Sequence, residues 1–121
     1  MKTKVLVVED DEAVLETIQL MLMGEFNVLI ARTGNEAINV FEFAEPEVIL
    51  MDILLPEKDG VEATKEILKR DPNVIVIGIT AYARRRGKEL LEAGAREVIE
   101  KPFGRRILID TIKRHLRSRK D

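Results

Sequence analysis

Short apolar runs that end in polar residues recur along the chain and predict buried strands. The central run is Val48 to Met51, which leads directly into Asp52 and is followed by a loop with Pro56 and Gly60. A wholly apolar run of this length, bounded by turn residues, is typical of a strand buried on both faces of a parallel sheet, and we expect it to end at Asp52. Four more strands are predicted at Lys4 to Val8, Asn27 to Ala31, Val74 to Thr80 and Glu97 to Glu100.

Helical segments are predicted between these runs, so that five helices alternate with five strands. Thr33 and Glu36 have the spacing of a capping box, Gly24 is typical of the residue after a helix, and Asp71-Pro72 ends another helix. The predicted helices span about Glu12 to Met23, Thr33 to Phe43, Val61 to Lys69, Arg84 to Ala93 and Arg105 to Ser118. We therefore expect one α/β domain over residues 1–121 with a doubly wound five-stranded parallel sheet, for which the flavodoxin-like order 2-1-3-4-5 is our hypothesis.

The composition is that of a globular domain and excludes several other classes of protein. The 121 residues are 45% hydrophobic, include no cysteine and carry a net charge of -2. These values exclude a disulfide framework and give no general attraction to nucleic acid. No apolar run approaches the ~18 residues of a membrane span, and the N-terminus lacks a signal-peptide pattern. A cytoplasmic domain that binds neither membrane nor nucleic acid is expected.

Polar side chains follow the predicted strands at the edge of the sheet where ligands bind in this architecture. They are four carboxylates, a hydroxyl and a lysine: Glu9, Asp10, Asp11, Asp52, Thr80 and Lys101. Clustered carboxylates repel one another, and oxygen ligands without His or Cys favour Mg²⁺ as the cation that removes the repulsion. A lysine and a hydroxyl suit an incoming phosphoryl group, so Asp52 is the candidate nucleophile that forms an acyl phosphate.

These residues resemble the receiver domain of two-component response regulators, and the resemblance covers nearly the whole chain. It rests on the order and spacing of Val8-Glu9-Asp10, Met51 to Pro56, Ile79-Thr80-Ala81 and Lys101-Pro102-Phe103. The resemblance implies a signalling switch that catalyses its own aspartyl phosphorylation and dephosphorylation and is otherwise not an enzyme. A histidine kinase or a small phosphodonor would supply the phosphoryl group, and a downstream protein target or output domain would receive the signal.

The resemblance also implies a role for each residue of the site. Asp52 would accept the phosphoryl group, Lys101 would contact it, and Thr80 would turn toward it. The implied ligands of Mg²⁺ are Asp10, Asp52, the main-chain carbonyl of Leu54, and Glu9 through water. The Lys101-Pro102 peptide bond is expected to be cis.

Some positions depart from the family pattern or have two interpretations. Many receivers carry Tyr or Phe three residues before the lysine, where this chain has Val98, and valine cannot make the same rotamer exchange; whether Tyr82 substitutes for that aromatic ring stays open. Leu54 and Tyr82 occupy the positions that tune attack by water, and neither orients water as an acid or amide does. We therefore expect a long-lived phosphorylated state. Asp11 either stabilises the first helix through the helix dipole or touches the metal.

Surface features indicate where partners bind. The predicted core stripe of the first helix is Val14, Ile18, Met21 and Leu22. Leu20 and Met23 lie away from that stripe. They are either isolated exposed apolar residues, which are common, or part of a docking surface for the kinase, as the resemblance implies. Arg84-Arg85-Arg86 opens the fourth helix, where cations oppose the dipole, and is either a solvated run or part of a partner surface. The resemblance implies an output surface, and a homodimer contact, around the fourth helix, fifth strand and fifth helix.

Two alternative functions stay open. A degenerate receiver would act by phosphorylation-independent protein contact; the complete set of site residues argues against it, whereas Val98 keeps it open. A small phosphatase of the haloacid-dehalogenase type would carry a second acid two residues after the nucleophile, where this chain has Leu54. If the chain ends at Asp121, we expect a stand-alone receiver whose output is protein contact.

Overall fold

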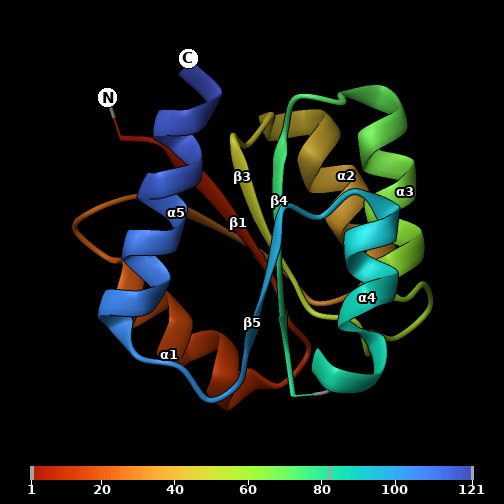
Figure 1. Cartoon of the computed structure of the whole chain (residues 1–121), viewed down its shortest axis with the longest axis horizontal. Helices are drawn as coiled ribbons and strands as arrows, with labels where there is room; N and C mark the ends of the chain where they lie inside the picture. The colour runs from red at the N-terminus through yellow and green to blue at the C-terminus, as the bar shows by residue number, and fades with distance from the viewer. Residues whose placement is uncertain (1, 82, 121) are drawn as a thin grey trace.

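The computed structural model describes residues 2–81 and 83–120, with the side chains of all but residues 83–85 and 120 (Figure 1). Strands and helices alternate in the order β1 (Lys4–Val8), α1 (Glu12–Leu22), β2 (Asn27–Ala31), α2 (Gly34–Ala44), β3 (Val48–Met51), α3 (Gly60–Arg70), β4 (Ile75–Thr80), α4 (Ala83–Ala93), β5 (Glu97–Glu100) and α5 (Arg105–Lys120). Every predicted element is present, and the boundaries differ from the predicted ones by one or two residues at most.

All five strands are parallel, in the order β2-β1-β3-β4-β5, which confirms the predicted doubly wound sheet. Val8 at the end of β1 lies opposite Ala31 of β2 and Met51 of β3, and Met51 lies opposite Gly78 of β4. Because neighbouring strands run in the same direction, their carboxyl ends meet at one edge, the lower end of the sheet in Figure 1. The polar residues that follow these strands are thereby brought to a common edge.

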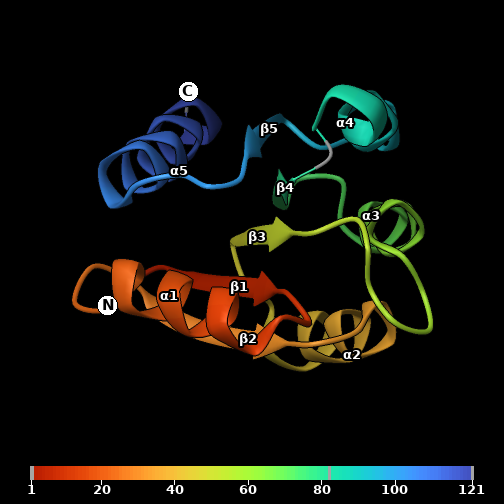
Figure 2. The ribbon, with the colours of Figure 1, turned by 90° about the horizontal axis from the view of Figure 1, so that it is seen from below.

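Helices cover both faces of the sheet (Figure 2). One hydrophobic cluster joins α1 and α5 to one face, and the other joins α2, α3 and α4 to the opposite face. Alternate residues of β1 contribute to the two clusters, Val5 and Val7 to the first and Leu6 and Val8 to the second. Among the described residues, no helix combines the length and the apolar character that a membrane crossing requires.

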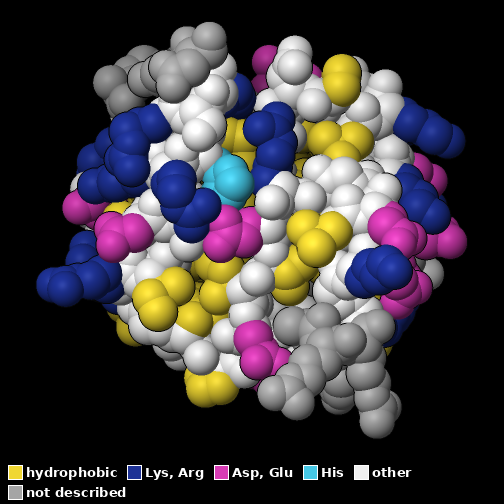
Figure 3. Space-filling model, in the orientation of Figure 1, with side chains coloured by type: hydrophobic (Ala, Val, Ile, Leu, Met, Phe, Trp, Pro, Cys, Tyr) yellow, Lys and Arg dark blue, Asp and Glu magenta, His cyan; other side chains and the backbone are white. Residues whose placement is uncertain are grey.

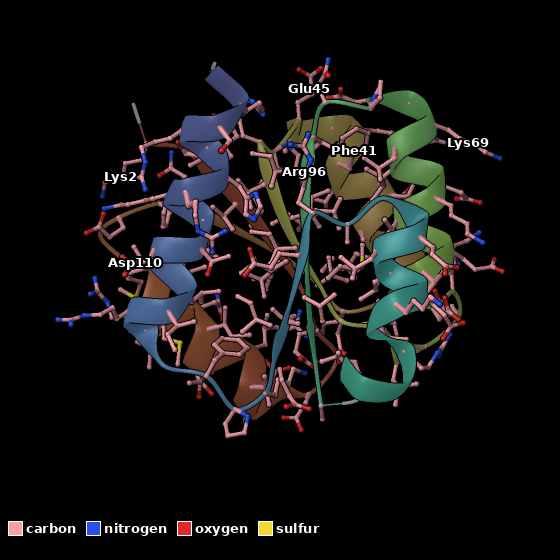
Figure 4. All side chains as sticks on the ribbon, viewed as in Figure 1. Lys2, Phe41, Glu45, Lys69, Arg96 and Asp110 are labelled. Carbon is pink, nitrogen blue, oxygen red and sulfur yellow. The ribbon has the colours of Figure 1, made fainter. Side chains whose placement is uncertain are left out.

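Helix α2 shows how local sequence sets an element. Thr33 is its N-cap, as predicted, and accepts a hydrogen bond from the Glu36 N–H at 3.0 Å. The Glu36 carboxylate accepts from the Arg32 N–H at 3.3 Å, one residue before the Thr33 N–H that the reciprocal bond of a capping box would use. Figure 4 shows Phe41 directed from α2 into the core, and Glu45 ends the helix in the left-handed conformation.

The core stripe of α1 differs from the prediction. Leu15, which the predicted stripe omits, is fully buried together with Ile18 and Leu22. Val14 and Met21, which the prediction placed in the core, are only half-buried at the edge of the cluster. The stripe is therefore rotated about the helix axis toward Leu15, because the sheet lies on that side and the side with Val14 borders the loop after β5.

Candidate functional site

The polar side chains predicted at the strand ends come together at one edge of the sheet. Glu9 and Asp10 follow β1, Asp52 follows β3, Thr80 is the last residue of β4, and Lys101 follows β5. One carboxylate oxygen from each of Glu9, Asp10 and Asp52 lies within 4.8 Å of the other two. The Lys101 side chain donates hydrogen bonds to Glu9 and Asp52. The main-chain N–H of Lys101 donates to the Thr80 carbonyl at 3.0 Å. Three carboxylates and one ammonium therefore share this edge.

Asp52 is held by the main chain and by Lys101. The residue is buried, at 6% exposure, and its N–H donates to the Val8 carbonyl at 3.1 Å. Its Oδ1 accepts from the Ile53 N–H at 2.8 Å, and its Oδ2 accepts from Lys101 Nζ at 3.2 Å. A buried carboxylate is costly unless a partner compensates it, and Lys101 supplies the opposite charge.

Glu9 and Lys101 stabilise each other's charged forms. Glu9 is 1% exposed; one of its oxygens accepts from Lys101 and the other from the Asp11 N–H at 3.1 Å. Burial raises the pKa of Glu9, and the hydrogen bond from Lys101 offsets this only in part. Burial lowers the pKa of Lys101, but the hydrogen bond to Glu9 and the charge of Asp52 outweigh it, so that this pKa lies above its ordinary value. Lys101 is therefore a fixed ammonium beside Asp52.

The donor atoms of the cluster fit a magnesium ion. Carboxylate oxygens are the hard ligands that Mg²⁺ prefers, and the cluster includes neither histidine nor cysteine. Asp10 is exposed, so the cluster is open to solvent on that side, whereas Glu9 and Asp52 lie behind it. The expected main-chain ligand, the carbonyl of Leu54, belongs to the loop that begins at Asp52.

Asp11 stabilises the start of α1. One of its carboxylate oxygens accepts from the N–H groups of Ala13 and Val14, at 3.0 and 3.2 Å, as an N-cap residue does. Among the described residues, the carboxylate cluster comprises Glu9, Asp10 and Asp52 without Asp11. Of the two interpretations of Asp11, the structure therefore supports the helix-stabilising one.

Aliphatic side chains cover the part of β4 that precedes Thr80. Val98 of β5 lies opposite Gly78 of β4. A Cβ built on Gly78 would lie 2.6 Å from Leu90 Cδ1 of α4 and 3.1 Å from Val98 Cγ2, so these two side chains fill the space above the glycine. Tyr82, considered above as a substitute for the aromatic ring that Val98 lacks, lies outside the described residues.

Two glycines that are not among the predicted site residues determine the course of the loop after Asp52. A Cβ built on Gly60 would lie 1.8 Å from the Asp52 carbonyl oxygen, and one built on Gly34 would lie 2.0 Å from that of Lys58. The Gly60 N–H also donates to the Ile53 carbonyl at 2.8 Å. The first turn of α3 thus abuts the main chain of Asp52, where a side chain has no room. In the sequence, Gly60 indicates only a turn.

An apolar cavity of about 240 Å³ lies beside the site, between α1 and the loop after β5. We call it the α1 groove; its apolar wall includes Ala13, Val14, Thr17, Met21, Pro102 and Phe103. The Lys101–Pro102 peptide bond in this wall is cis, as the resemblance implied. Leu20 and Met23 are 66% and 62% exposed, which confirms that they lie away from the core, but they do not line the groove.

Comparison with known proteins identifies the family. The sequence model of the response regulator receiver domain matches residues 5–113. The chain therefore belongs to the response regulator receiver domain family. Members of this family are phosphorylation-dependent signalling domains of two-component systems, which phosphorylate and dephosphorylate themselves and interact with histidine kinases and output domains.

Solved receiver domains have the same fold as this chain. A CheY-like receiver domain protein from Methanospirillum hungatei JF-1 is 32% identical, with a TM-score of 0.93 over 99% of this chain and 98% of that one. The receiver domain of the sensor histidine kinase PA1611 from Pseudomonas aeruginosa PAO1, with a magnesium ion coordinated in its active site cleft, is 31% identical, with a TM-score of 0.88 over 94% and 97%. The BeF3-activated DrrB receiver domain is 30% identical, with a TM-score of 0.88 over 97% and 99%.

Replacing Gly60 with alanine should destabilise the loop that carries Asp52. The added methyl group would overlap the Asp52 main chain, and overpacking of this kind typically costs about 1–3 kcal/mol. We expect a correspondingly lower free energy of unfolding in denaturant titrations followed by circular dichroism. Gly104→Ala is the control, because a Cβ at that position meets nothing within 4 Å. Equal losses in the two variants would contradict the close approach at Gly60.

Proposed function

We propose that the domain is a signalling switch in which Asp52 accepts a phosphoryl group from a histidine kinase or a small phosphodonor. The observation that carries this proposal is the position of Lys101, whose ammonium contacts both Asp52 and Glu9 beside the carboxylate cluster. Membership of the receiver domain family and the magnesium ion in the PA1611 receiver domain support it.

The proposed reaction transfers one phosphoryl group to Asp52. One carboxylate oxygen of Asp52 attacks phosphorus; in the structure Oδ1 accepts from the Ile53 N–H and Oδ2 from Lys101. As the new O–P bond forms, the P–N bond of phosphohistidine or the P–O bond of a small acyl phosphate breaks, and its electron pair goes to the leaving imidazole or carboxylate. Lys101, 3.2 Å from Oδ2, would pair with the phosphoryl oxygens, and the Thr80 hydroxyl would donate to one of them after turning toward the site.

Magnesium is the cofactor that this proposal includes. Asp10, Asp52 and the main-chain carbonyl of Leu54 would hold the ion, with Glu9 acting through water. When bound, the ion would neutralise part of the negative charge of the carboxylates and the phosphoryl oxygens. Lys101 supplies one positive charge to a cluster of three carboxylates, so the site retains an attraction for a cation.

The phosphodonor is proposed to dock over α1. A donor histidine must approach the site from solvent, and the α1 groove borders Lys101 directly. Met21 and Phe103 line the groove, and apolar side chains continue outside it with the exposed Leu20 of α1 and Met23 directly after the helix. Such a surface fits the packing face of a helical bundle, which is the occupant that we assign to it.

The output surface is proposed to lie on the face formed by α4, β5 and α5. Figure 3 shows hydrophobic side chains among charged ones of both signs on this face. Among the described side chains of this face, Leu91 of α4 and Ile107 of α5 are large, apolar and exposed, and Glu97 of β5 pairs with Arg114 of α5 at 2.9 Å. A surface that carries both signs can complement itself across a two-fold axis, so a second copy of the domain is the partner that we assign.

Incubation with Mg²⁺ and acetyl phosphate should add one phosphoryl group to the wild-type protein and none to Asp52→Asn, because an amide is not a nucleophile here. Intact mass measures the adduct, and EDTA should abolish it. After the donor is removed, the adduct should persist for minutes, since Leu54 does not orient water for attack. No adduct on folded wild-type protein would favour a degenerate receiver, and a half-life of seconds would contradict the long-lived state.

Replacing both Leu20 and Met23 with glutamate should slow phosphoryl transfer from a histidine kinase by about tenfold, the effect of ~1.4 kcal/mol of lost binding. The rate with acetyl phosphate should not change, because the site itself is intact. Phe43→Glu is the matched control, since Phe43 is 94% exposed on α2, on the other face of the sheet. Equal slowing with both donors would refute the docking surface.

Leu91→Glu should prevent phosphorylation-dependent dimerisation by placing a charge in the proposed apolar contact. We expect light scattering after size exclusion to show a dimer for wild-type protein with Mg²⁺ and beryllofluoride, and a monomer for Leu91→Glu. Phe43→Glu should behave as wild type. If the wild-type protein is a monomer with beryllofluoride as well as without it, the homodimer is ruled out. A downstream protein would then be the partner of this face.

A further inference from the structure

We propose that the ion pair between Arg86 and Asp59 couples helix α4 to the loop that carries Asp52, so that a change at Asp52 reaches the first turn of α4. This inference rests on the proposed phosphorylation of Asp52. It adds a physical link through which the site acts on one side of the output surface.

The ion pair joins two elements that flank the site. Arg86 Nη2 donates to Asp59 Oδ2 at 3.5 Å, and Arg86 Nε donates to Glu89 Oε2 at 2.6 Å. Of the ion pairs that the described side chains of α4 form, only the pair of Arg86 with Asp59 reaches outside the helix. Arg86 therefore holds the first turn of α4 against the start of α3.

Asp59 connects this ion pair to the main chain of Asp52. Its other carboxylate oxygen, Oδ1, caps α3 by accepting from the Glu62 N–H at 3.0 Å. The next residue, Gly60, donates its N–H to the Ile53 carbonyl at 2.8 Å and abuts the Asp52 carbonyl without room for a Cβ. Because Gly60 and the Asp52 carbonyl are already in close contact, a displacement of Asp52 has to move Gly60 and, with it, the neighbouring Asp59.

The sequence of α4 makes its first turn dependent on outside contacts. Residues 84–86 place three cations at the helix start, with no acidic residue in the first turn, and so oppose the helix dipole. Gly87 follows, and glycine in a helix interior lowers helix stability further. The middle of the helix is better anchored, because Leu90 is fully buried over Gly78 of the sheet. The first turn is thus the part of α4 that is free to respond.

Two connections converge on this turn. The chain itself leads from Thr80, at the end of β4 in the site, to α4, which begins at Ala83. The ion pair leads from Asp59 to Arg86. A phosphoryl group that draws Thr80 and displaces the Asp52 loop would act on the turn through both connections, with Leu90 as the fixed point.

Two substitutions remove the ion pair. Arg86→Gln also removes the ion pair of Arg86 with Glu89, which Asp59→Asn leaves in place. Asp59→Asn keeps a side-chain oxygen that caps α3, because asparagine and aspartate are equivalent N-cap residues. Arg86→Gln removes the charge and retains a polar side chain. Arg70→Gln is the matched control, since Arg70 pairs with Glu42 between α3 and α2 at the opposite end of α3.

The coupling can be measured by the hydrogen-exchange rates of the amides of residues 87–90, whose hydrogen bonds close the first turns of α4. The rates are compared with and without Mg²⁺ and beryllofluoride. Without beryllofluoride, we expect these amides to exchange two- to fivefold faster in Asp59→Asn and in Arg86→Gln than in wild type. The double variant should show no further increase. Beryllofluoride should alter the exchange of these amides in wild type. We expect that response to be at least threefold smaller in the two variants and unchanged in Arg70→Gln.

Wild-type exchange rates in both variants would overturn the proposal. Faster exchange with an undiminished response to beryllofluoride would also overturn it, because the ion pair would then brace α4 without coupling it to the site. If wild-type protein gives no phosphoryl adduct and binds no beryllofluoride, the proposed function fails and the coupling role fails with it. In that case the comparison of unmodified proteins still shows separately whether the ion pair holds α4.

Discussion

An ammonium group between two buried carboxylates is the interaction on which the rest of the site depends. Without Lys101, Glu9 and Asp52 would be like charges buried side by side, a costly arrangement. Lys101 reaches both because it follows β5 directly and its main chain is bonded to Thr80 of the neighbouring strand. The parallel sheet thereby places Lys101 and Glu9, 92 positions apart in the chain, in direct contact.

The loop after Asp52 is constrained as tightly as the charges are. Gly60 and Gly34 bring the starts of two helices against main-chain carbonyls of this loop, at Asp52 and Lys58 respectively. Close packing of this kind transmits displacement, because neighbouring groups cannot yield independently. The charged cluster therefore lies on a closely packed support that two helices share, so a displacement of Asp52 would reach them.

Much of the fold, and the gathering of polar side chains at the strand ends, could be predicted because both depend on local sequence. Apolar runs mark the strands, and site residues such as Asp52 directly follow them. The side of α1 that faces the sheet was harder to predict, because Leu15 and Val14 are neighbours on the helix and the position of the loop after β5 decides between them. The contact between Arg86 and Asp59 depends on α3 and α4 lying side by side, which no local pattern in the sequence reveals.

In the proposed function, the two faces of the sheet would separate the approach of a donor from the response to it. The α1 groove lies on the side covered by α1 and α5, whereas the first turn of α4 belongs to the layer on the other side (Figure 2). A donor seated in the groove would lie on the opposite side of the sheet from the layer that contains α4. In the proposed function, delivery of the phosphoryl group and its effect on α4 would therefore involve different faces, and the domain would be free to change its state before its donor has departed.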